Sequence, residues 1–154
     1  MNSKLLVFLG AFTLFGCSDD SAIVANQAAH SEDVVKLIEA NKLVWTSSNI
    51  QTYTFTYYSP PTDCPNVDPY PPVEITVEEG TISRLFVPDL DVLLDIEDSR
   101  YPTINGIFIK MDEKSFNIKG VPTFDTTFGY PVKYGVDLSD AECDGYSVNV
   151  SSFI

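Results

Sequence analysis

Apolar and polar residues alternate along several short segments of this chain, a pattern typical of strands that are buried on one side only. In the segment 53–58, YTFTYY, every second residue is an aromatic that can face a core. The same alternation fills 73–78, Glu79-Gly80 then predicts a tight turn, and 82–87 is expected to return as the second strand of a hairpin. Later strands are predicted between Phe116 and Asp125, and over 132–136 and 146–151.

Two segments follow the 3.6-residue period of an amphipathic helix instead. The first is predicted over 32–45, with Ser31 as its N-cap, and its apolar positions are Val34, Leu37, Ile38 and Trp45. The second begins after Thr103, another capping residue, and its apolar positions are Ile104, Ile107, Phe108 and Met111. Trp45 is interpreted as a core residue rather than a ligand platform.

The predicted order is α-βββ-α-βββ, an α+β fold. Because the connections between strands are short, neighbouring strands are expected to be antiparallel. We therefore expect one antiparallel sheet of about six strands with two helices packed on one face.

Two segments interrupt these patterns. Six prolines in 59–72 rule out a helix or a central strand and predict a stiff extended loop; a polyproline ligand is the functional alternative. The segment 88–100 carries five acidic residues. Only Asp89 and Asp91 have the spacing of calcium ligands and no glycine follows them, so a solvated loop or short irregular helix is preferred to a calcium site.

The first seventeen residues have the features of a bacterial lipoprotein signal. Lys4 precedes an apolar run from Leu5 to Phe15, which is too short to span a membrane. Leu-Phe-Gly-Cys at 14–17 then matches a lipobox, apart from the bulky Phe15, and predicts lipidation of Cys17. A plain secretory signal is the alternative, but no A-x-A-like site precedes Cys17.

This interpretation divides the chain into a signal peptide, 1–16, a lipidated tether, 17–30, and a single domain, 31–154. The lipid anchor would hold the protein in the bacterial cell envelope. Ser18 after the lipidated cysteine predicts the outer membrane, with the domain facing the periplasm.

The charge of the mature chain excludes one class of partner. Once Lys4 leaves with the signal, 8 basic residues remain against 22 acidic ones, a formal charge of −14. Such a surface repels phosphate backbones, so nucleic acid is not expected as a partner. Anionic lipid headgroups are repelled too, and contact with the membrane should come through the anchor.

Cys64 and Cys143 remain after Cys17 is assigned to the anchor. An even number of cysteines in an oxidising compartment predicts a disulfide, and two separate thiols are the alternative. A zinc site needs three or four ligands, and the single histidine, His30, lies in the predicted tether, so no metal and no cofactor are expected.

Several segments resemble a known family of bacterial lipoproteins. They are Trp45, 50–55, 63–65, 73–77, 102–104, 124–131 and 136–137, followed by a polar strand to Phe153. The chain is similar over about 40–153 to the uncharacterised "domain of unknown function 6174" family. That family has no established activity, so the resemblance implies no catalytic residues.

We expect a non-catalytic protein-interaction module with a partner in the envelope. No nucleophile stands beside a base, and no glycine-rich phosphate loop is present. Tyr58, Phe128 and Tyr130 are the candidate contact residues. The alternative is a small-ligand or lipid-binding domain, which a void of roughly 300 Å³ or more between helices and sheet would favour.

Overall fold

The computed structural model describes residues 20–154, with side chains from residue 30 onwards. The predicted signal peptide, 1–16, and the lipidation site Cys17 therefore lie outside the described residues. These residues contain two α-helices, α1 (Asp20–Ser48) and α2 (Ile104–Glu113). Two short 3₁₀ turns, η1 (Pro88–Leu90) and η2 (Ser115–Asn117), connect other elements.

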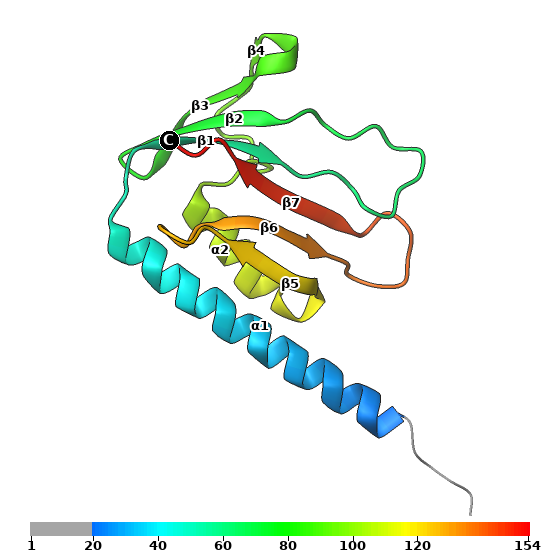
Figure 1. Cartoon of the computed structure of the whole chain (residues 1–154). Coiled ribbons are helices and arrows are strands. Elements are labelled where there is room, and N and C mark those ends of the chain that lie inside the picture. The colour runs from blue at the N-terminus through cyan, green and yellow to red at the C-terminus, as the bar shows by residue number, and fades with distance from the viewer. Residues whose placement is uncertain (1–19) are drawn as a thin grey trace, which may run out of the picture.

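Seven strands form a single antiparallel sheet (Figure 1). They are β1 (Tyr53–Tyr58), β2 (Val73–Glu78), β3 (Thr81–Val87), β4 (Val92–Leu93), β5 (Ile118–Phe124), β6 (Pro131–Val136) and β7 (Tyr146–Ser151). Their order in space is β4-β3-β2-β1-β7-β6-β5. The last strand of the chain thus pairs with the first, with Tyr57 opposite Val150, and joins two meanders into one sheet.

The α+β class is confirmed, and two boundaries differ from expectation. The first helix begins at Asp20 rather than at residue 32, so much of the segment predicted as a tether is helical. The acidic segment 88–100, expected to be a loop or short irregular helix, contains η1 and then β4, which pairs with β3 and raises the strand number to seven. A two-residue strand is too short for alternation to reveal it.

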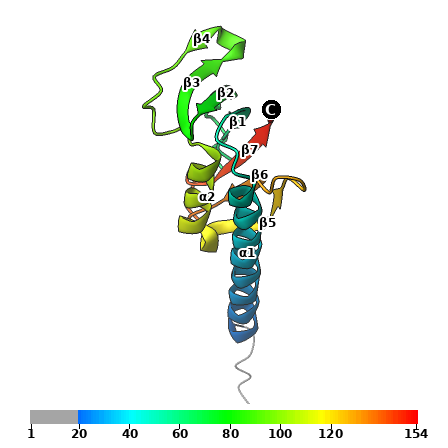
Figure 2. The ribbon, with the colours of Figure 1, turned by 90° about the vertical axis from the view of Figure 1, so that its left-hand side faces the viewer.

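One core lies between the sheet and the helices. Every second residue of β1 and β2 is buried, as the alternation predicts: Tyr53, Phe55, Tyr57, Val73, Ile75 and Val77. The helices cover these side chains with Val34, Ile38 and Trp45 from α1 and Ile104, Ile107, Phe108 and Met111 from α2. Figure 2 shows the sheet curving from β4 to β5 with α2 on one side of it.

The two helices are fixed to the core by polar contacts as well. Thr103 caps α2 as predicted, since its hydroxyl accepts a hydrogen bond from the Gly106 N–H at 3.1 Å. Trp45 is 3% exposed, and its indole N–H donates to Asn105 Oδ1 at 2.8 Å. These bonds set the position of α2, whose last turn borders the pocket described next.

Candidate functional site

A pocket of about 440 Å³ opens where the end of β1, the start of β7, the last turn of α2 and the end of the proline-rich segment meet. This volume lies in the range of small-molecule sites, and the hollow is open at the surface rather than enclosed between the helices and the sheet. Its wall is dominated by four tyrosines, Tyr57, Tyr70, Tyr101 and Tyr146. Its charged residues are Arg100, Lys110, Glu113 and Lys114.

The tyrosines of this wall come from four separate segments. Tyr57 is buried on β1, and its ring meets that of Tyr101 edge to face, with the centroids 6.3 Å apart. Tyr146 begins β7 opposite Val136. Tyr70 lies near the end of the proline-rich segment, and its exposed fraction is 67%. Together the four rings offer flat apolar surfaces with hydroxyl groups at their edges.

Burial makes three of these phenols harder to ionise. It raises the pKa of Tyr57, Tyr101 and Tyr146 above the ordinary value near 10, because the phenolate would lose its hydration. The hydroxyls therefore act as hydrogen-bond donors and acceptors rather than as bases. This part of the pocket is suited to binding more than to proton transfer.

Arg100 forms one side of the pocket entrance. Its guanidinium lies over the Tyr70 ring, 4.7 Å from the centroid, and over the Tyr101 ring at 5.5 Å. Asp98 holds it there by accepting hydrogen bonds from Nε at 3.0 Å and from Nη2 at 2.6 Å. Asp98 thus fixes the Arg100 guanidinium against the rings of Tyr70 and Tyr101.

Lys110 and Lys114 stand one turn apart at the C-terminal end of α2. Lys110 Nζ donates a long hydrogen bond of 3.5 Å to the Arg100 carbonyl. Burial lowers the pKa of Lys110, because the pocket removes water from the ammonium, and the Glu113 charge opposes that shift in part. Neither lysine has a carboxylate within ion-pair distance in the described part of the chain.

The proline-rich segment 59–72, which carries Tyr70, is bonded to the loop before β7. Cys64 and Cys143 form a disulfide across a separation of 79 residues, the pair that the cysteine count predicts. The Thr62 N–H donates to the Gly145 carbonyl at 3.0 Å, and the Asp63 carboxylate accepts from the Gly145 N–H at 3.0 Å. These contacts make the segment a fixed wall.

A group of three aspartates lies near this disulfide. One oxygen each of Asp63, Asp137 and Asp144 fall within 4.8 Å of one another. Their oxygens already accept hydrogen bonds from loop N–H groups and from Ser139, and Asp137 pairs with Lys119 at 3.4 Å. We therefore assign the group to loop structure. Asp89 and Asp91 belong to no such group among the described residues.

The three residues predicted as a contact surface do not lie together. Tyr58 faces outward at the end of β1, opposite Asn149. Tyr130 stacks on Phe153 with the centroids 4.5 Å apart, and Phe128 lies 6.1 Å from the same ring. Because Phe153 also stacks on Tyr53, these two belong to the other end of β1. Their role in interaction stays a prediction.

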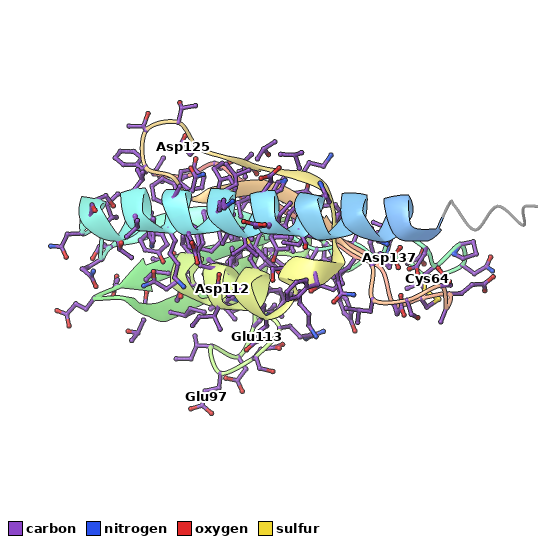
Figure 3. All side chains as sticks on the ribbon, turned by 90° about the horizontal axis from the view of Figure 1, so that it is seen from below. Cys64, Glu97, Asp112, Glu113, Asp125 and Asp137 are labelled. Atoms are coloured by element: carbon purple, nitrogen blue, oxygen red, sulfur yellow. A yellow bond between two sulfur atoms is a disulfide. The ribbon has the colours of Figure 1, made fainter. Side chains whose placement is uncertain are left out.

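The pocket and the β5–β6 turn are on different sides of α1. Figure 3 shows Glu113, which lines the pocket, on the opposite side of α1 from Asp125 in that turn. The same view places Cys64 and Asp137 towards the N-terminal end of the helix. A ligand in the pocket would therefore not touch Phe128 or Tyr130.

Sequence reasoning did not find the pocket residues. Tyr70 lies in the proline-rich segment and Arg100 ends the acidic segment 88–100, whereas the others are scattered over β1, β7 and the residues around α2. One signal was present, namely two lysines four residues apart in a strongly acidic chain. Helical spacing places Lys110 and Lys114 on the same face.

Comparison with known proteins gives a family and no activity. None of the helices described is long and apolar enough to cross a membrane. No curated protein and no solved structure matches the chain. Residues 37–154 match DUF6174, a family of unknown function, and the match covers most of the 154 residues, so the chain belongs to that family.

Proposed function

We propose that this protein is a lipid-anchored component of the bacterial cell envelope whose domain binds a small ligand, without catalysis, in the tyrosine-lined pocket. The observation that carries the proposal is the pocket itself, about 440 Å³ in volume with four tyrosine rings in its wall. Ligand sites of this size are concave, largely apolar and edged by a few polar groups. The pocket has each of these features.

The chemistry of the lining supports binding rather than reaction. The lining residues include no histidine and no cysteine, and burial raises the pKa of Tyr57, Tyr101 and Tyr146. A nucleophile activated by an adjacent base is the usual requirement of covalent catalysis. The disulfide and the hydrogen bonds of Thr62 and Asp63 connect the proline-rich segment to the loop before β7. A wall held in place before binding loses less entropy when a ligand binds.

The lipid anchor at Cys17 and the envelope location are supported by the lipobox and by the disulfide, since disulfides persist in oxidising compartments. Figure 1 shows α1 extending past the sheet at its N-terminal end, so this helix would act as a spacer between the anchor and the domain.

Cell fractionation of Cys17→Ser tests the anchor. The variant should leave the membrane fraction, and a membrane-bound, fully processed variant would contradict the proposal.

The binding proposal is tested by protein-observed NMR of the full chain against a panel of small aromatic and aliphatic compounds. Compounds that bind should shift the amide signals of Tyr57, Arg100 and Lys110. Tyr70→Ala removes an exposed part of the wall and should weaken these shifts, whereas the matched variant Tyr58→Ala on the outer face should leave them unchanged. Shifts confined to the outer face, or none at all, would overturn the proposal.

A further inference from the structure

We infer that the ligand carries one acidic group, a carboxylate or a phosphate, on a flat apolar body, and that Lys110 and Lys114 bind this group. The inference rests on the proposed function and names its ligand class. It follows from the distribution of cations over the molecule, from the balance of charge in the pocket and from the shape of the aromatic wall.

Cations are scarce in this chain, and most are used in ion pairs. Of the eight basic residues in the described part, five pair with a carboxylate: Lys36, Lys42, Arg84, Arg100 and Lys119. Lys110, Lys114 and Lys133 do not. Two of these three line the pocket, although acidic residues outnumber basic ones by more than two to one. Among the described residues, most of the lysines without an ion-pair partner therefore lie in the pocket.

The position of Lys110 suits an incoming anion. Its ammonium has three N–H donors, and the 3.5 Å contact with the Arg100 carbonyl engages one of them weakly. Burial lowers the pKa of Lys110, so the charged ammonium is less stable there than in water. An acidic group beside it would offset this penalty and gain charge-assisted hydrogen bonds, which are about twice as strong as neutral ones.

The charge balance favours a single acidic group. Arg100, Lys110 and Lys114 contribute three positive charges, while Glu113 and the Asp98 partner of Arg100 contribute two negative ones. The net charge near the pocket is therefore about +1. A second acidic group on the ligand would meet the Glu113 carboxylate and be repelled.

The aromatic wall favours a flat body. Arg100 already stacks on Tyr70 and Tyr101, so the wall presents planar surfaces on which a ring system can stack in turn. A naphthalene ring with one substituent is smaller than the 440 Å³ available. Naphthalene derivatives are therefore suitable probes for the test.

The test is calorimetric titration of the full chain in detergent, blanked against detergent alone, with two isosteric probes. 2-Naphthoate carries the acidic group and 2-naphthamide is its neutral counterpart. We expect 2-naphthoate to bind about tenfold more tightly, the smaller part of the range for hydrogen bonds to charged groups. A third arm, 2-naphthyl phosphate, decides between the two acids, since the tighter of the two anions identifies the group that the pocket accepts.

Lysine variants test whether Lys110 and Lys114 cause the preference for 2-naphthoate over 2-naphthamide. Lys110→Met and Lys114→Met keep most of the aliphatic stem, and the double variant should bind both isosteric probes equally. Lys133→Met, which removes the third unpaired lysine from the outer face of β6, should keep the preference. Circular dichroism checks that each variant is folded.

The outcomes separate this inference from the proposed function. If both isosteric probes bind wild type equally well in the pocket, or the preference survives in the double variant, acid recognition by these lysines is overturned and the binding function stands. If no probe binds wild type, the inference about the ligand class is overturned, while the binding function is decided by the wider compound panel.

Discussion

Tyr53 shows how a single side chain connects the sheet to a helix. Its ring is buried on β1, and its hydroxyl oxygen accepts a hydrogen bond from the Ile104 N–H at 3.1 Å. Ile104 is the first residue of α2, where backbone N–H groups lack partners within the helix. One phenol thus fills part of the core and fixes the start of the helix that carries Lys110.

Tyr53→Phe should lower the free energy of unfolding by about 1–2 kcal/mol, because a buried N–H loses its acceptor. Urea unfolding followed by circular dichroism measures the change. Tyr58→Phe, on the outer side of the same strand, is the matched control and should change stability by less than about 0.5 kcal/mol. Equal effects from the two variants would show that the bond to Ile104 does not contribute.

At the scale of elements, the turn between β5 and β6 packs directly on α1. Gly129 in this turn has φ of 74°, and a Cβ atom there would lie 2.6 Å from the Asn41 carbonyl oxygen and 2.8 Å from Val44 Cβ. Gly129 is therefore required for two reasons: its backbone is left-handed, and α1 leaves no room for a Cβ atom. Gly120 in β5 has a similar φ of 69° with nothing within 4 Å.

Comparing the two glycines separates the cost of backbone strain from the cost of a steric clash with α1. Gly120→Ala should cost about 1 kcal/mol from its left-handed backbone alone, whereas Gly129→Ala should cost at least about 2 kcal/mol more because α1 must move. Thermal unfolding of both variants measures the difference. Similar costs would mean that the turn and the helix adjust without loss of packing.

The disulfide links the proline-rich segment to the loop before β7. Cys64→Ser and Cys143→Ser should each lower the free energy of unfolding by about 4 kcal/mol, since either removes the same cross-link from the unfolded chain. The double variant should cost no more than either single one. Denaturant titration tests this, and a double variant with twice the cost would mean that the cysteines stabilise the fold separately.

At the scale of the whole molecule, buried tyrosines make stability depend on alkaline pH. Burial raises the pKa of Tyr53, Tyr57 and Tyr134 in the folded protein, whereas the same phenols in the unfolded chain ionise near pH 10. The unfolded state therefore loses protons first. The stabilisation from these groups is complete below about pH 10 and is lost as the pH rises further.

The free energy of unfolding should consequently fall above about pH 10, by on the order of 1 kcal/mol per buried tyrosine for each pH unit. Lys110 acts in the opposite direction, because burial lowers its pKa, but it is one group against several tyrosines whose pKa is raised. Urea unfolding at about pH 9 and about pH 11 measures the change. Constant stability across this interval would contradict the burial of the phenols.

Much of the fold could be predicted because burial on one face leaves a period in the sequence. The alternation in 53–58 and 73–78 and the helical spacing after Thr103 each have one structural solution, and the structure adopts it. The start of α1 and the two-residue β4 escaped prediction. In the first case the small residues of 20–30, DSAIVANQAAH, show no clear helical period, and in the second the strand is too short to show one.

The sequence alone determined the period of each main strand and helix, the candidate anchor at Cys17, the acidic charge and the pairing available to Cys64 and Cys143. These depend on local order or on composition. Only the tertiary structure decided that β7 lies beside β1 and that Tyr57, Tyr70, Tyr101 and Lys110 surround one pocket. The physical reason is that a pocket is made by packing distant segments together, and no local pattern records which segments will meet.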